Sequence, residues 1–147
     1  MRNKLLILLV GFMSFSSFSQ EWETSFEEAK AKATKNQHNI VLVFQGSDWC
    51  APCIKLDKEI WSSAEFQSLS KDHFVMLLAD FPRKKANKLS DEQTAQNAKL
   101  AELYNNQGYF PLVVVLDKAG KELGKLGYEK LSPRAYFEKL TSLERAH

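Results

Sequence analysis

The stretch Trp49-Cys50-Ala51-Pro52-Cys53 decides the fold that we predict for this chain of 147 residues. An apolar run at residues 40–44 precedes it, and apolar residues at helical spacing follow at residues 54–61. A continuous apolar run is typical of a strand covered on both faces, so the predicted order is strand, short loop, cysteine pair and helix. Cysteines three residues apart on the first turn of a helix lie on one side, where their sulfurs can bond or separate with little backbone movement.

The predicted position of Cys50 favours its thiolate form. At the start of a helix, unpaired backbone N–H groups and the positive end of the helix dipole point toward the first cysteine. The thiolate is the form that attacks a disulfide. Pro52 suits the same turn, because its missing N–H would have no intrahelical partner there. The sequence therefore predicts a nucleophilic thiol at Cys50.

Three interpretations of the cysteine pair compete. A structural disulfide across so short a loop would constrain little of the unfolded chain and would add little stability. Half of a zinc site would need further ligands, but there is no second Cys-x-x-Cys, and His38, His73 and His147 lack the paired spacing of zinc modules. The placement between strand and helix favours a redox-active dithiol, which requires neither metal nor cofactor.

Trp-Cys-x-Pro-Cys after a buried strand resembles the active site of thioredoxin-like proteins. The resemblance covers most of the chain beyond the first twenty or so residues. It implies an α/β chain with the thioredoxin fold, in which a central mixed β-sheet is flanked by helices. It also implies a catalytic pair, with Cys50 as the exposed attacking thiol and Cys53 as the buried resolving thiol.

A second part of the resemblance lies at Phe110-Pro111, just before an apolar run at residues 112–116. A proline is compatible with the start of a strand. In thioredoxin-like proteins a proline here is cis and lies against the cysteines, so the resemblance implies a cis Pro111 and a Phe110 backbone that pairs with substrate. A trans proline is the alternative, since few X-Pro bonds are cis. Trp49, Phe110 and Pro111 are the predicted substrate-binding residues.

The other elements complete the thioredoxin order. Helices are expected at residues 21–36, in a short piece capped by Ser62, at residues 91–104 with Asp91 as the cap, and after Ser132. Strands are expected at residues 74–79, 112–116 and 122–127. The first helix is an addition to the thioredoxin order, and the segment between Asp80 and Pro111 is longer than in thioredoxin itself.

Part of that longer segment is basic and irregular. Residues 81–90 contain Arg83, Lys84, Lys85 and Lys88. Such a cluster is consistent with a solvated loop or with a docking patch for an acidic partner. In the helix that follows, Ala95, Ala98 and Ala101 are the predicted inner face.

Phe44 marks a departure from the family. It occupies the place where thioredoxin has a buried acid that assists proton transfer from the resolving thiol. Burial without a base raises the pKa of a thiol, so we expect Cys53 to deprotonate slowly. Asp48, Asp57 and Glu59 are candidate substitutes acting through water, with solvated surface charges as the alternative interpretation.

Residues 1–19 have the pattern of a secretory signal peptide. Arg2 and Lys4 precede an apolar run at residues 5–15, which is too short to span a bilayer. Small residues follow, so we expect cleavage before Gln20, with an uncleaved anchor as the alternative. The predicted product is a thioredoxin-like domain at residues 20–147, located in the periplasm or secreted.

Charge and cysteine content narrow the range of partners. Beyond the signal peptide, basic residues balance the 18 acidic ones, which gives no general attraction to nucleic acid. Both cysteines of the chain lie in the motif, so no structural disulfide competes in an oxidising compartment. We expect a monomer that acts on disulfide-containing proteins and receives electrons from a membrane thiol donor.

The residues between the cysteines favour a reductase. Ala51-Pro52 supplies neither a histidine nor a charge, which resembles reducing members of the family, whereas oxidases often carry a histidine there. An oxidase or isomerase working in the opposite direction is one alternative. A non-enzymatic peptide-binding or chaperone-like module on the same fold is another. A peroxide-scavenging enzyme is weakly supported, because peroxide reduction usually needs a polar pocket around the thiolate and the sequence indicates none.

Overall fold

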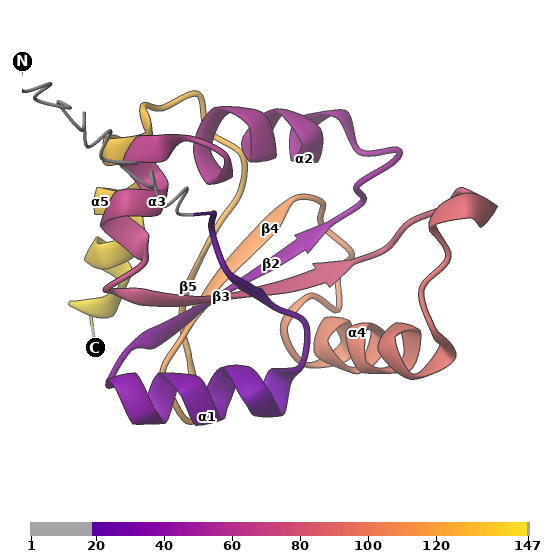
Figure 1. The fold of residues 1–147 in the computed structure, drawn as a ribbon, viewed down its shortest axis with the longest axis horizontal. Coiled ribbons are helices and arrows are strands. Elements are labelled where there is room, and N and C mark those ends of the chain that lie inside the picture. Colours follow the sequence, from indigo (N-terminus) through magenta and orange to yellow (C-terminus); the bar gives the residue numbers. More distant parts are fainter. Residues whose placement is uncertain (1–18, 147) are drawn as a thin grey trace, which may run out of the picture.

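The computed structural model describes residues 19–146, which form one mixed sheet flanked by helices (Figure 1). The strand order is β1-β3-β2-β4-β5. The first three strands are mutually parallel, whereas β4 runs antiparallel to β2 and β5 antiparallel to β4. The strands are β1 (Trp22–Glu23), β2 (Asn39–Gln45), β3 (Phe74–Asp80), β4 (Leu112–Leu116) and β5 (Glu122–Leu126). The predicted thioredoxin order of strands is confirmed.

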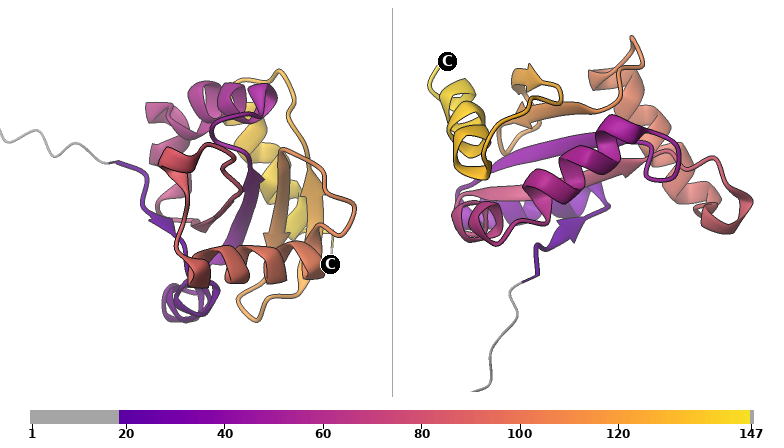
Figure 2. Two further views of the ribbon diagram at one scale, coloured as in Figure 1. Left: turned by 90° about the vertical axis from the view of Figure 1, so that its right-hand side faces the viewer. Right: turned by 90° about the horizontal axis from the view of Figure 1, so that it is seen from above.

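The helices lie on both faces of this sheet, with α1 and α4 on one side and α2, α3 and α5 on the other (Figures 1 and 2). The α-helices are α1 (Phe26–Asn36), α2 (Ala51–Leu56), α3 (Ala64–Ser70), α4 (Asp91–Tyr104) and α5 (Pro133–Glu144). A π-helical turn, η1 (Asp57–Trp61), continues α2, and a short 3₁₀ turn, η2 (Lys85–Asn87), precedes α4. The predicted signal peptide lies outside the described residues except for its last position.

The central strand β2 contributes side chains to two hydrophobic cores. Ile40, Leu42 and Phe44 point into the core under α1 and α4. Val41 and Val43 point into the opposite core, under α2, α3 and α5. Alternate side chains of a strand face opposite sides of the sheet, so the uninterrupted apolar run is explained by burial on both faces. Within residues 19–146, no helix combines the length and apolar character needed to cross a membrane.

The first helix begins later than predicted. Trp22–Glu23 is a short strand that pairs with Met76 and Leu77 of β3, so these residues are not available to a helix. The Ser25 side chain then caps α1 by accepting a hydrogen bond from the Glu28 N–H at 3.3 Å. Edge pairing with β3 thus competes successfully with local helix propensity.

Three smaller predictions were also wrong. The cap of α3 is Ser63 rather than Ser62, and that of α4 is Ser90 rather than Asp91. The inner face of α4 is formed by Asn97 and Leu100, not by the predicted alanines, of which Ala95 and Ala98 are exposed. The reason lies in β3: Asn97 donates a hydrogen bond to the carbonyl of Asp80 at 2.9 Å, which turns this polar side chain inward.

Candidate active site

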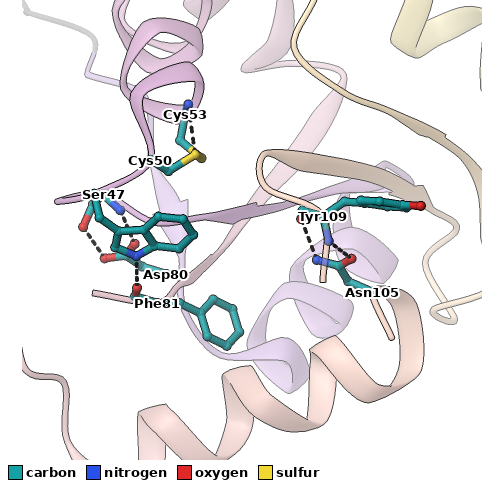
Figure 3. Close-up of a disulfide and its surroundings, with 8 residues drawn as sticks. Ser47, Cys50, Cys53, Asp80, Phe81, Asn105 and Tyr109 are labelled. Carbon is teal, nitrogen blue, oxygen red and sulfur yellow. Dashed lines mark hydrogen bonds between the residues drawn. A yellow bond between two sulfur atoms is a disulfide. The ribbon is translucent and has the colours of Figure 1, made fainter. Parts of the chain in front are cut away.

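The two cysteines lie where β2 passes into α2, at the carboxyl end of the parallel strands (Figure 3). They form a disulfide with an S–S distance of 2.05 Å and a Cα–Cα distance of 5.2 Å. Cys50 is the N-cap of α2, and its Sγ accepts a hydrogen bond from the Cys53 N–H at 3.3 Å. Pro52 lies in the first turn. Strand, loop, cysteine pair and helix follow one another as predicted.

Cys50 is more buried than the resemblance implied. Only 4 % of its surface is exposed, compared with 2 % for Cys53. The disulfide is the physical reason, because the Cys50 sulfur turns inward to bond Cys53 and to accept its N–H. In this state the two sulfurs are bonded to each other and neither is available to zinc.

Trp49 connects residues 49–53, which we call the cysteine turn, to the segment that follows β3. Its Nε1–H donates to the Phe81 carbonyl at 2.7 Å, and its ring meets that of Phe110 edge to face at 5.4 Å between centroids. The Arg83 guanidinium lies 3.7 Å from the centroid of the Trp49 ring, a cation–π contact. Gly46 permits this placement, because a Cβ there would come within 2.2 Å of the indole.

The start of β4 supplies the remaining predicted residues. The Phe110–Pro111 peptide is cis, and Pro111 is buried. The turn before it is held by Asn105, which is 4 % exposed, accepts a hydrogen bond from the Tyr109 N–H at 2.9 Å and donates one to the Tyr109 carbonyl at 2.8 Å (Figure 3). The structure therefore brings Phe110 from this turn onto Trp49 from the cysteine turn.

Two carboxylates fix the loops around the disulfide, and the first is Asp80 at the end of β3. It accepts hydrogen bonds from the Ser47 N–H at 2.9 Å and from the Ser47 hydroxyl at 2.6 Å (Figure 3). These bonds hold the loop between β2 and α2 against the neighbouring strand. The sequence predicted a strand over residues 74–79, which left Asp80 just outside it and gave this carboxylate no role.

The second carboxylate, Asp48, binds the basic segment rather than a thiol. It accepts hydrogen bonds from the Arg83 N–H at 2.9 Å, the Lys84 N–H at 3.0 Å and the Asn87 side-chain amide at 3.0 Å. The Arg83 N–H first, and then the Asn87 amide, hold the pKa of Asp48 below its ordinary value of 3.8. A carboxylate so engaged is a poor proton acceptor, which argues against one of the three predicted substitutes.

The other two candidates are also engaged with neighbours. Glu59 accepts a hydrogen bond from the Tyr128 hydroxyl at 2.9 Å and lies 4.0 Å from the Lys55 ammonium. Asp57 is exposed and lies 3.5 Å from the Ser62 hydroxyl. Phe44 is fully buried near the end of β2, so an aromatic ring and not a carboxylate lies at this point of the strand.

A groove of about 630 Å³ opens beside Trp49. Three of its six lining residues are aromatic, and the Arg83 guanidinium lies over the Trp49 ring. The lining residues are Trp49, Phe81, Pro82, Arg83, Gly108 and Phe110. Two of the predicted substrate-binding residues, Trp49 and Phe110, therefore line one continuous surface.

Comparisons with known proteins agree with this geometry. A family model described as thioredoxin-like matches residues 21–118. The chain belongs to the thioredoxin-like family. The disulfide bond reductase DsbH of Chlamydia pneumoniae is 38 % identical over 122 residues, covering 83 % of this chain and 71 % of that protein.

Two solved structures place this thioredoxin-like chain among known folds. A DsbH oxidoreductase matches with a TM-score of 0.81 and 32 % identity, covering 97 % of this chain and 96 % of the other. A thioredoxin from Thermus thermophilus matches with a TM-score of 0.62 at 20 % identity, covering 85 % and 87 %, and supports the fold alone. Family membership and the Cys50–Cys53 pair make the chain a thiol–disulfide oxidoreductase.

Proposed function

We propose that the protein reduces disulfides of other proteins in the cell envelope through its Cys50–Cys53 couple. The observation that carries the proposal is the disulfide at the start of α2, next to the Trp49–Phe110 surface. The likeness to a protein named disulfide bond reductase supports the direction of electron flow. The uncharged Ala51-Pro52 pair supports the same direction, since nothing between the cysteines selectively stabilises a thiolate there.

In the proposed reaction the reduced protein begins as a Cys50 thiolate and a Cys53 thiol. The Cys50 sulfur attacks one sulfur of the substrate disulfide, and the other substrate sulfur leaves as a thiolate that takes a proton from water. Cys53 then loses its proton and attacks the Cys50 sulfur, which releases the second substrate thiol. Two electrons pass to the substrate, and the protein is left with the disulfide seen in the structure.

The start of α2 favours the first of these steps. The Cys53 N–H already points at the Cys50 sulfur at 3.3 Å, and a hydrogen bond to the charged form of a group lowers its pKa. The second step lacks such help, because Phe44 occupies the position of the family's acid and Asp48 is hydrogen-bonded elsewhere. We expect Cys53 to lose its proton directly to water or to the buffer.

Substrate binding is assigned to Trp49, Phe110 and Pro111. An extended substrate segment would lie in the groove beside Trp49 and pair with the backbone at Phe110, as a strand added to an exposed edge does. The aromatic walls supply apolar contact area, while the backbone pairing is independent of sequence. This arrangement suits many disulfide-containing proteins as substrates.

The remaining parts of the proposal concern the surroundings of the protein. Cleavage of the signal peptide before Gln20 would release a thioredoxin-like domain of residues 20–147 into the periplasm or the medium. A reductase in an oxidising compartment needs electrons, so we propose a membrane thiol carrier as its donor. One exposed active-site surface per chain is sufficient for this chemistry, and we propose a monomer.

Reduction of insulin in the presence of dithiothreitol tests the activity. The wild-type protein should accelerate precipitation of the insulin chains, and Cys50→Ser should not. In cells, Cys53→Ser should accumulate mixed disulfides with substrates, because the resolving thiol is missing while the attacking one remains, and Cys50→Ser is the matched control. A wild-type protein that leaves insulin intact would refute the proposed activity.

A further inference from the structure

The segment between β3 and α4 projects beyond the carboxyl end of the sheet (Figures 1 and 2). Residues 83–88 are exposed, and four of these six residues carry a positive charge. The four basic residues are Arg83, Lys84, Lys85 and Lys88. The proposed reduction chemistry makes no use of them.

This basic segment is fastened to the two residues that precede the active-site cysteine Cys50. Asp48 binds the N–H groups of Arg83 and Lys84 and the side chain of Asn87, and Trp49 binds the Phe81 carbonyl. On the α4 side, a cavity of about 280 Å³ separates the segment from Thr94 and Asn97 of the helix. Trp49 and Asp48, the two residues before Cys50, therefore hold the segment in place.

The positive charge of the segment is only partly balanced. Lys88 lies 3.6 Å from Asp91, but both side chains are well exposed. The two carboxylates next to the groove, Asp48 and Asp80, are occupied by hydrogen bonds. Within residues 19–146, neither Arg83 nor Lys85 pairs with a carboxylate. Arg83 thus lines the groove with its guanidinium over the Trp49 ring, and within residues 19–146 the N–H donors of that guanidinium are not engaged by a carboxylate.

From this arrangement we infer that the basic segment selects substrate polypeptides with an acidic residue within a few positions of the disulfide cysteine. The inference rests on the proposed function. Arg83 lies against Trp49, the residue next to Cys50. An extended chain advances about 3.3 Å per residue, so a substrate that lies in the groove beside Trp49 would pass Arg83 a few residues from its cysteine. A guanidinium binds a carboxylate through two parallel hydrogen bonds, and the neighbouring lysines attract acidic chains over a longer range.

Synthetic peptides provide the test. Each peptide carries one cysteine joined by a disulfide to uncharged 2-mercaptoethanol. Three peptides are compared, and they differ only at two positions that lie two to four residues from the cysteine and are both Glu, both Gln or both Lys. The fully reduced protein transfers two electrons, so the products are its Cys50–Cys53 disulfide, the free peptide thiol and 2-mercaptoethanol. The second-order rate constant is measured by stopped-flow fluorescence at low and at high salt.

The Glu peptide should react about tenfold faster than the Gln peptide at low salt, and the Lys peptide should be slowest. High salt should reduce the differences, because it screens exposed charges. The preference for the Glu peptide should disappear in a variant in which all four basic residues are replaced by Gln (Arg83→Gln, Lys84→Gln, Lys85→Gln and Lys88→Gln). Arg83→Gln alone should remove part of this preference. The control Lys35→Gln/Lys118→Gln/Lys121→Gln removes charges from the opposite end of the sheet and should keep it.

Equal rates for the three peptides would overturn the inference while leaving the proposed function intact. A preference that survives in the folded Arg83 and lysine variants would overturn it as well. If no peptide is reduced by the wild-type protein, the proposed function fails and the inference with it. Binding of the segment to vesicles containing phosphatidylserine, without discrimination among the peptides, would assign the charge to a membrane surface instead.

Discussion

Two segments meet at Trp49, and they differ in almost every physical respect. In the cysteine turn the two sulfur-bearing residues are buried, with Cys50 4 % and Cys53 2 % exposed, and the Cys53 N–H donates to the Cys50 sulfur. The basic segment at residues 81–90 is mostly exposed and charged, and it depends on Asp48 for its position. The first segment carries chemistry that acts on any accessible disulfide, whereas the second is placed to discriminate among the chains that present one.

Removal of a sulfur should have the largest effect. Cys50→Ser takes away the attacking group, so the rate of disulfide reduction should fall to that of the uncatalysed reaction with dithiothreitol. Cys53→Ser should still perform the first attack and stop as a mixed disulfide. Both are measured with insulin and by mass spectrometry of the trapped protein. Substantial turnover by Cys50→Ser would place the chemistry outside the cysteine turn.

Gly46→Ala should disturb the cysteine turn and the basic segment together. An added Cβ would lie 2.2 Å from the indole of Trp49, so the ring must leave its place against Phe81 and Phe110. Overpacking of this kind costs about 1 to 3 kcal/mol, measured by urea unfolding. The matched control is Gly127→Ala, whose added Cβ would have its nearest neighbour at 3.9 Å and should change stability little.

Asn105→Ala should weaken the wall opposite the cysteine turn. It removes two partly buried hydrogen bonds to Tyr109 and leaves both backbone groups without this partner. The expected loss is about 1 to 2 kcal/mol of unfolding free energy, with a rise in KM because the turn before Phe110 loosens. The exposed neighbour Asn106 provides the control substitution, Asn106→Ala. An unchanged KM would separate this wall from substrate binding.

The smallest expected effect is the acid response of the basic segment. The pKa of Asp48 is held below 3.8 in the folded protein. Its stabilising contribution is therefore fully present above the unfolded value and is lost as pH falls through the lower folded value. The amide signals of Arg83 and Lys84 in NMR spectra should shift with a midpoint below 3.8. Asp48→Asn should abolish that shift, and a midpoint above 3.8 would contradict the account.

The same contrast explains which features the sequence could predict. The cysteine turn was predictable because its strand, loop and helix are local patterns of a few residues each. The turn Phe110-Pro111 was predictable through the family resemblance. The expectation that Phe44 stands in place of the family's acid rests on the number of positions that separate it from Trp49, and it stays a prediction.

The supports of the site could not be predicted, because each joins residues distant along the chain. Asp48 and Arg83 are 35 positions apart in the chain. From the sequence alone, a carboxylate beside a cysteine motif is as consistent with a proton acceptor as with a residue that anchors a distant loop. Asn97 faces inward only because the end of β3 offers it a carbonyl. Cys50 is 4 % exposed where its sulfur is bonded to Cys53, and the sequence does not record which redox state the cysteine pair is in.

The reduction potential of the Cys50–Cys53 couple tests the central claim most directly. The protein is equilibrated with thiol–disulfide buffers of defined ratio, and its free thiols are alkylated and counted by mass. We predict a value closer to about −270 mV, that of reducing thioredoxin, than to about −120 mV, that of a strong periplasmic oxidant. A value near the oxidant's would reverse the direction of electron flow and contradict the proposal that this protein is a reductase.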